Sequence, residues 1–389
     1  MKKLNRILAL ILIISFFSCQ ATTKEEKAIA KNTTYSAIEV IEDNTIQVAL
    51  LLDTSNSMDG LIDQAKAQLW QIVNELSYAK CEGERPNLEI ALYEYGNDNL
   101  LKKDGYIRQV LAFTKDLDDI SERLFSLTTN GGSEYCGQVI QTSLDKLPWR
   151  KGKNDLKLIF IAGNEPFTQG PVNYKDASLN AKEKDVTINT IFCGEYNHGI
   201  SGMWQDGALQ TSGDYMSIDH NVKTVHIPSP YDDQILQLNI QLNGTYIYYG
   251  RHGKKKATAQ AVQDSNAQGY SEANAVSRTV TKSSGFYQNS SWDLVDAEEE
   301  EDFDLKDVDK KSLPEDLQGK SLKEIEKIIE EKRAERKNIQ NQIQELNQKR
   351  LEFIAEKKKD NASDQNLENA LINTIKKQAS RKNYTWKKN

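Results

Sequence analysis

The sequence has few of the residues from which catalytic sites are usually built. Its four histidines show neither zinc-ligand spacing nor a His-Glu-x-x-His helix: they are His198, His220, His226 and His252. The glycines around Ser201 lack the spacing of a nucleophile elbow, and residues 250–253 leave too few positions between their glycines for a phosphate-binding loop. We therefore expect no catalytic residues and no enzymatic activity.

The chain also lacks an excess of positive charge and has only four cysteines. A formal net charge of −7 at pH 7 argues against a nucleic-acid partner. Cys136 would begin a helix and Cys193 would end a strand, at the same end of the sheet proposed below. We predict a disulfide between these two residues and a free Cys81, and the alternative is three buried thiols.

A long hydrophobic run is present only near the start, at residues 7–17. It is too short to span a bilayer, and with three cations before it the segment is typical of a signal peptide. The run ends at Ser18-Cys19, which resembles a bacterial lipobox, although Phe16 stands where an aliphatic residue is usual. The resemblance implies that Cys19 is lipidated and becomes the new amino terminus.

We accordingly predict a lipoprotein signal peptide at residues 1–19 and a flexible tether at residues 20–43, which contain little to bury. An ordinary secretory signal cut near Ala21, or an uncleaved anchor, is the alternative. Lipidation implies attachment to the bacterial cell envelope. Gln20 is not the Asp that typically retains lipoproteins at the inner membrane, which favours the outer membrane and leaves its periplasmic or surface face open.

The stretch at residues 47–60 has the strongest functional pattern in the chain. An unbroken apolar run at residues 48–52 is typical of a strand buried on both faces of a parallel sheet. It ends in Asp53-x-Ser55-x-Ser57, and an amphipathic helix follows. One carboxylate and two hydroxyls on alternate residues offer only oxygen ligands, which suits a hard divalent cation. Open α/β sheets bind ligands at this position, the carboxyl end of a central strand.

Further strands and helices alternate along the chain. The expected strands share apolar or alternating patterns, and they lie at residues 88–95, 107–113, 156–161, 186–192 and 213–218. Strands that alternate with helices require right-handed crossovers. We therefore predict an α/β fold with a doubly wound, mostly parallel sheet.

These features resemble the von Willebrand factor A (VWA) family over residues 44–220. The family's metal site opens with Asp-x-Ser-x-Ser, and Gly131-Gly132-Ser133 stands where a second loop usually reads Gly-Gly-Thr. The resemblance implies a divalent cation, Mg²⁺ or else Mn²⁺ or Ca²⁺. Its implied ligands are the residues that match the motif: Asp53, Ser55, Ser57 and Ser133.

A third loop departs from the family pattern, because Gly163 stands where the family has Asp. Asn164, Glu165 or Glu134 could replace that carboxylate, directly or through water. In the family the cation commonly binds an acidic side chain of a protein partner, so the resemblance implies such a partner here. The alternative is a metal-free domain in which Asp and Ser merely cap a helix.

The rest of the chain is predicted to be largely helical. Residues 221–296 are expected to form a mainly helical extension packed on the VWA domain, and residues 297–320 an acidic, solvated linker. Ser321 to Glu324 is a capping box that opens a long helix at residues 321–360. Its apolar seam is interrupted by cations, which leaves two alternatives, a weak coiled coil that self-associates or a solvated single helix. Residues 361–389 are expected to be a basic tail, either soluble or in contact with an anionic surface.

Together these patterns predict a cell-envelope lipoprotein that binds a protein partner through a divalent cation. The alternative is a metal-free structural protein that assembles a scaffold through its carboxyl-terminal helices.

Overall fold

The computed structural model describes residues 44–219, 227–358 and 367–386. The predicted signal peptide, the tether and the lipidated Cys19 lie outside these residues. Within them, no helix is both long enough and apolar enough to cross a membrane.

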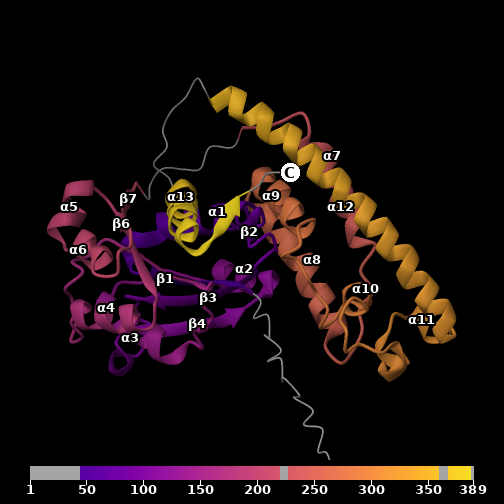
Figure 1. The fold of residues 1–389 in the computed structure, drawn as a ribbon, viewed down its shortest axis with the longest axis horizontal. Helices are drawn as coiled ribbons and strands as arrows, with labels where there is room; N and C mark the ends of the chain where they lie inside the picture. The colour runs from indigo at the N-terminus through magenta and orange to yellow at the C-terminus, as the bar shows by residue number, and fades with distance from the viewer. Residues whose placement is uncertain (1–43, 220–226, 359–366, 387–389) are drawn as a thin grey trace, which may run out of the picture. The chain divides into compact units, whose positions relative to one another are not determined.

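A six-stranded sheet forms the centre of the first part of the chain (Figure 1). Its order is β4 (Ile107–Thr114), β3 (Asn87–Tyr95), β1 (Thr45–Asp53), β5 (Leu156–Gly163), β6 (Thr187–Cys193) and β7 (Tyr215–Ile218). All neighbouring pairs are parallel except β3 and β4. The predicted α/β fold with a mostly parallel sheet is confirmed, and β1 lies inside it between β3 and β5.

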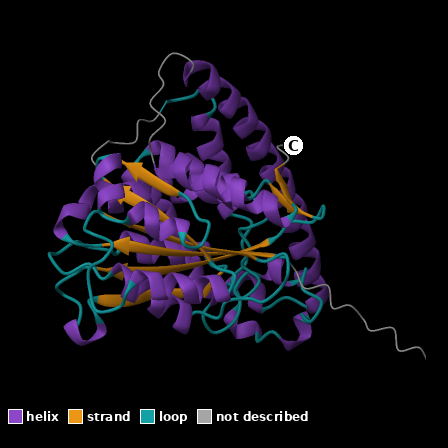
Figure 2. Cartoon of the chain, turned by 60° about the vertical axis from the view of Figure 1, so that its left-hand side comes forward, coloured by secondary structure: helices purple, strands orange, loops and turns teal. Residues whose placement is uncertain are grey.

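Helices cover both faces of the sheet, as Figure 2 shows. Strand β1 alternates between them: Val48 and Leu52 pack into one apolar cluster, and Ala49 and Leu51 into the other. The first face is covered by α1 (Asp59–Leu76) and α2 (Leu117–Phe125), the second by α3 (Cys136–Lys146), α4 (Tyr174–Glu183) and α6 (Trp204–Leu209). The short α5 (Tyr196–Ser201) follows β6. Burial on both faces explains why β1 is an unbroken apolar run.

The last helix on the α1 face comes from the end of the chain. Helix α13 (Leu367–Ala379) packs against α1, and Leu371 and Ile375 are buried in the cluster on that face. After η5 (Ser380–Lys382), β8 (Tyr384–Trp386) pairs antiparallel with β2 (Ala79–Cys81). Residues 44–219 and 367–386 thus form one unit, called the sheet domain below.

The prediction of a free basic tail is therefore wrong for residues 367–386. Its cations pair with acidic residues of the sheet domain, Lys376 with Glu75 and Lys377 with Asp214. The cations predict a solvated segment, whereas the apolar residues between them, such as Leu371 and Ile375, face the core. Figure 1 shows α13 beside α1.

Residues 227–358, called the insertion, lie between β7 and α13 in the sequence and are helical. Their helices are α7 (Asp232–Asn243), α8 (Gly253–Tyr270), α9 (Glu272–Lys282), α10 (Leu294–Ala297), α11 (Glu315–Gln318) and α12 (Leu322–Lys358). Helix α9 packs against α1. Arg278 of α9, almost fully buried, pairs with Asp118 of α2 at 2.7 Å. The predicted helical extension packed on the sheet domain is thus present.

Helix α12 is neither a solvated helix nor a free coiled-coil strand. Its seam residues Ile339, Ile343 and Leu346 pack with α7 and α9 in one buried cluster. The cations that interrupt the seam are buried partners of acids: Arg336 binds Asp293 and Arg350 binds Asp232. Both predicted alternatives fail because the seam is covered from within the same chain. The predicted capping box is confirmed, since Glu324 N donates to Ser321 Oγ at 3.3 Å and Ser321 N donates to Glu324 at 2.8 Å.

The predicted acidic linker is also folded. It contains the 3₁₀ turns η3 (Leu305–Asp307) and η4 (Lys310–Ser312), and Leu305, Leu313 and Leu317 are buried beside two isoleucines of α12. The prediction of a solvated linker is wrong because it weighed the run of acids and overlooked three spaced leucines. These leucines, with Phe303 and Val308, pack the segment against the same apolar cluster as α12.

Candidate functional site

Asp53 ends β1 at the carboxyl edge of the sheet and is fully buried. Its Oδ1 accepts a hydrogen bond from the Ser55 backbone N at 2.8 Å, whereas Oδ2 has no partner among the described residues. Burial raises the pKa of Asp53 to about 7, with smaller contributions in the same direction from the charges of the neighbouring Glu134 and Glu165. A buried carboxylate with a bare oxygen is costly unless a cation or proton compensates it.

The two predicted hydroxyl ligands lie next to each other. Ser55 Oγ and Ser57 Oγ are 3.2 Å apart, and Asn164 Nδ2 donates to Ser57 Oγ at 3.0 Å. The Oδ1 of Asn164 is buried without a partner in the described part of the chain. Ser55 is the residue before η1 (Asn56–Met58), and Met58 is the residue before α1. Neither side chain makes a hydrogen bond that caps its helix. This arrangement gives no support to the alternative in which Ser55 is present only as a helix cap.

Glu134 supplies a second carboxylate close to Asp53. Gly96, in a left-handed conformation with φ of 75°, lies between them: a Cβ there would be 2.8 Å from Asp53 Oδ1 and 2.8 Å from Glu134 Cγ. Glu134 is buried, and the Ser55 hydroxyl lies near enough to its carboxylate to lower its pKa slightly. Burial, and next the charge of Glu165, raise the pKa of Glu134 to about 7. Glu134 is one of the three residues expected to replace the missing carboxylate, and the fold brings it close to Asp53.

The backbone of the second loop explains how Glu134 reaches this place. A Cβ on Gly132 would collide with the backbone carbonyl of Gly96, so only glycine lets the two loops approach this closely. Ser133, between Gly132 and Glu134, is half-buried. The predicted ligand Ser133 therefore lies in the loop that meets the Asp53 edge, and no hydrogen bond fixes its hydroxyl to another described residue.

Tyr95 accounts for the missing third-loop carboxylate. A Cβ on Gly163 would be 2.6 Å from the Tyr95 hydroxyl and 3.0 Å from Asp53 Oδ2. The Tyr95 hydroxyl donates to the Ala162 carbonyl oxygen at 3.0 Å. An aspartate at position 163 would need the room that this buried tyrosine occupies. The sequence around Tyr95 predicts only the end of a strand, because no local pattern indicates that its hydroxyl reaches Gly163.

These residues could hold a divalent cation. Among the described residues no three His, Cys, Asp or Glu side chains converge as a ligand set. The donors at this edge are instead two carboxylates, Asp53 and Glu134, with the hydroxyls of Ser55 and Ser57 and the amide oxygen of Asn164. All are oxygen donors, which fits Mg²⁺, Mn²⁺ or Ca²⁺ and not a soft metal.

The predicted Cys136–Cys193 disulfide is wrong. Cys81, Cys136 and Cys193 are all free and buried thiols. Cys136 belongs to the apolar cluster on the α3 face of the sheet and Cys193 to the cluster on the α1 face. The two residues do lie at the same end of the sheet, as predicted, but the sheet separates their side chains.

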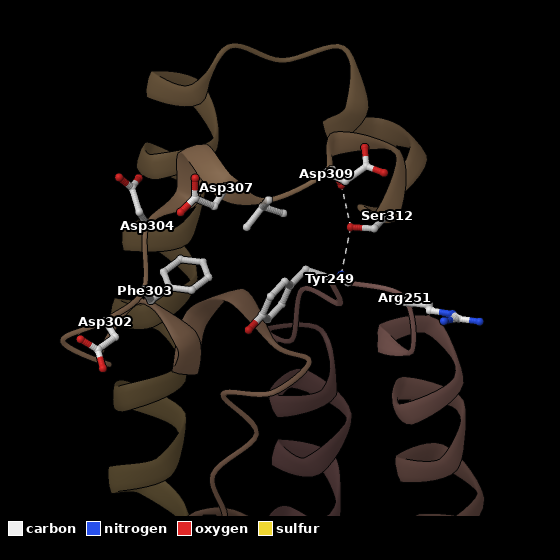
Figure 3. Close-up of a pocket in the computed structure, with 10 residues that line it drawn as sticks. Tyr249, Arg251, Asp302, Phe303, Asp304, Asp307, Asp309 and Ser312 are labelled. Carbon is white, nitrogen blue, oxygen red and sulfur yellow. Dashed lines mark hydrogen bonds between the residues drawn. The ribbon is translucent and has the colours of Figure 1, made fainter.

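A cavity of about 580 Å³ lies in the insertion, and none of the predicted site residues lines it. Figure 3 shows its lining, in which the rings of Tyr249 and Phe303 lie among four aspartates. Two of these, Asp304 and Asp309, accept backbone N–H groups at the starts of η3 and η4. Helix capping explains their presence, and the Asp53 edge remains the candidate site.

In a chelator, the free energy of unfolding is expected to fall as the pH rises from about 4 to about 7. The pKa of Asp53 is about 7 in the folded protein, against an ordinary value of 3.8. Between these values the unfolded chain has lost the proton that the folded chain retains, so raising the pH favours unfolding. Urea unfolding across this range should show the decline in wild type and a flatter profile in Asp53→Asn. Identical profiles for the two proteins would contradict the assignment.

Residues 47–201 match the model of the von Willebrand factor type A domain. Similar solved structures include the conserved hypothetical protein BatB from Bacteroides thetaiotaomicron, which is 17% identical over 45% of this chain and 90% of that one, with a TM-score of 0.35. Another is the SpRpn10 VWA domain, 18% identical over 44% and 87%, with a TM-score of 0.34.

A third is proximal thread matrix protein 1 from the mussel byssus, with a zinc-occupied MIDAS motif. It is 12% identical over 45% of this chain and 42% of that chain, with a TM-score of 0.34. A comparison with curated protein sequences gives no match.

Proposed function

Because residues 47–201 form a von Willebrand factor type A domain, we propose that the protein binds a protein partner through a divalent cation at the Asp53 edge. Domains of this type often bind proteins in a metal-dependent way and are usually non-catalytic. The observation that carries the proposal is the buried Asp53 carboxylate, whose free Oδ2 lies in a cluster of oxygen donors. A cation there would compensate a charge that the fold otherwise leaves exposed to a low dielectric.

In this proposal Asp53 and Glu134 are the charged ligands. Ser55 and Ser57 add hydroxyls, Asn164 contacts Ser57 and adds its amide oxygen, and Ser133 is a further proposed ligand from the second loop. Glu134 takes over the charge that Gly163 does not provide, because Tyr95 fills the space beside Gly163. Glu165 remains a charged neighbour, since it raises the pKa of both carboxyl groups.

We further propose that the domain is exported and anchored to the bacterial cell envelope through Cys19, with the outer membrane as the expected location. The lipobox-like sequence and the polar tether support this proposal. The scaffold alternative loses its support, because the α12 seam that would assemble copies of the chain is buried within the chain.

Thermal unfolding of the full chain tests the metal site. Millimolar Mg²⁺ or Mn²⁺ should stabilise wild type relative to EDTA by about 2.7 kcal/mol when the cation is at about 100 times its dissociation constant. Asp53→Asn and Glu134→Gln should each lose most of this shift. In EDTA at neutral pH, Asp53→Asn should be at least as stable as wild type, because the variant removes an uncompensated buried charge.

The matched control is Asp302→Asn, which removes one carboxylate on the insertion and should keep the full metal shift. The proposal fails if wild type shows no shift with any of Mg²⁺, Mn²⁺ and Ca²⁺. It fails equally if Asp53→Asn retains the wild-type shift.

A further inference from the structure

A lysine is buried where three helices of the insertion meet. Lys282, the last residue of α9, is fully buried, and α9 packs against both α7 and α8 (Figure 1). Its Nζ donates to Oδ1 of Asn243 on α7 and, at 2.9 Å, to Oδ2 of Asp264 on α8. A further contact joins Nζ to Asn239 Oδ1 at 2.9 Å. The amine thus contacts side-chain amides and a carboxylate at the same time, inside the fold.

Asp264 Oδ2 contacts both nitrogen atoms of the Lys282–Asn243 pair. It accepts a hydrogen bond from Asn243 Nδ2 at 2.8 Å as well as the one from Lys282 Nζ. The corresponding distance from Asn239 Nδ2 is longer, at 3.2 Å. An ammonium has only donors and a carboxylate only acceptors, so the Asn243 carbonyl must face Lys282 and its amide nitrogen must face Asp264. A carboxylate in this position can carry protons from the amine to the amide nitrogen.

The surroundings favour the neutral form of the amine. Burial lowers the pKa of Lys282 to about 8, against the opposing charge of Asp264 and with a further contribution from the charge of Arg278. Arg278 Nε donates to Asp264 Oδ1 at 2.6 Å, so a cation remains beside the carboxylate when Lys282 loses its charge. The centre of the Tyr246 ring lies 5.9 Å from Lys282 Nζ, and this ring packs against the apolar cluster of α7, α9 and α12. A desolvated, neutral lysine is a good nucleophile.

We propose that Lys282 and Asn243 join in an intramolecular amide bond, with Asp264 as the proton carrier. The Nζ lone pair attacks Asn243 Cγ, the Nζ–Cγ bond forms, and the Cγ–Nδ2 bond breaks. One of the three ammonium protons stays on the new amide. Asp264 passes the other two to the leaving nitrogen, which departs as ammonium. The reaction consumes no oxidant, water or cofactor, and the fold supplies the contact between the groups that a reaction in solution lacks.

The bond would tie α7 to α9 and close a loop of chain within the insertion. Among the described residues the cysteines are all free, so no disulfide provides such a cross-link there. A cross-link restricts the unfolded chain and thereby stabilises the folded one. Helix α9 also packs against α1 of the sheet domain, so the bond would strengthen the part of the insertion that contacts that domain. This inference is independent of the proposed metal site.

Peptide mapping of the full chain by mass spectrometry tests the inference. After incubation at about pH 8, near the pKa of Lys282, the protein is unfolded and digested with trypsin. A free Lys282 is cleaved and gives the linear peptides 224–251, 279–282 and 283–306. A bonded Lys282 resists cleavage, so residues 224–251 and 279–306 should appear as one branched peptide that has lost one ammonia. If wild type gives only the linear peptides, the inference is overturned.

Two asparagines one turn apart on α7 provide a matched pair of variants. Asn243→Ala should abolish the branched peptide, and Asn239→Ala should retain it. The reverse result would overturn the assignment to Asn243. Asp264→Asn, with its helical content checked by circular dichroism, should give at least about tenfold less branched peptide, because the proton carrier is lost. A folded Asp264→Asn protein with the wild-type yield would overturn the proposed reaction.

Discussion

Replacing Arg336 by alanine is expected to destabilise the protein by about 3–5 kcal/mol, because it leaves buried acids without their cation. Arg336 lies on α12 and is 4% exposed. Its Nη1 binds Asp293 at 2.7 Å and Asp296 at 2.5 Å, and its Nε donates to Thr245 Oγ1 at 3.0 Å. The guanidinium also lies 4.2 Å from the centre of the Tyr246 ring. Two carboxylates, one of them fully buried, would lose their strongest partner.

Chemical denaturation at neutral pH measures the effect, and Arg333→Ala is the matched control. Arg333 lies one turn earlier on α12 and pairs with Glu298, but its side chain is 35% exposed. Its removal should cost about 1 kcal/mol or less, as is usual for solvated pairs. Equal and small effects at the two positions would mean that α12 is solvated, as one of the sequence alternatives held.

Replacing Ile375 by alanine is expected to cost about 2–5 kcal/mol. Ile375 lies on α13, is 1% exposed, and packs in the apolar cluster that also contains Leu69 of α1 and Phe160 of β5. A cavity would open beneath a helix that lies at the far end of the sequence from the strands it covers. Thermal or denaturant unfolding of the full chain should show the loss.

Asn373→Ala is the control for this prediction, because Asn373 is on the same helix and is exposed. Its substitution should change the free energy of unfolding by less than about 0.5 kcal/mol. If Ile375→Ala behaves like Asn373→Ala, residues 367–386 do not belong to the sheet domain. The same result would mean that the sheet domain ends near residue 219.

The two predictions concern segments for which sequence patterns gave the wrong answer. Charged residues dominate residues 297–320, and residues 367–386 carry a cluster of cations, so both segments are expected from sequence to be solvated. Their few apolar residues, such as Leu305 and Ile375, are buried against elements far away in the sequence. Composition indicates how much apolar surface a segment can bury. It does not show whether an element distant in the sequence will pack against that segment.

The candidate site was predictable in part. Asp53, Ser55 and Ser57 follow one strand within five residues, so their common location is a local property. Ser133 is expected only from the resemblance of Gly131-Gly132-Ser133 to the family's Gly-Gly-Thr loop, and the structure shows that this loop runs close to the backbone at Gly96. The position of Glu134 beside Asp53, and the reason for Gly163, depend on Tyr95 and Gly96 of another strand end. The separation of Cys136 from Cys193 depends on the faces of the sheet.

By itself, the sequence determined the strand, loop and helix around Asp53, the mostly parallel sheet and the start of α12. Each of these features follows from a short-range pattern in the sequence. The patterns are an apolar run, apolar residues with the period of a helix or a strand, or a capping box. Only the tertiary structure decided that α13 returns to the sheet, that α12 packs within the chain and that Glu134 joins Asp53. Those features arise from contacts between residues far apart in the chain, where burial of a few apolar side chains and compensation of buried charge select the partner.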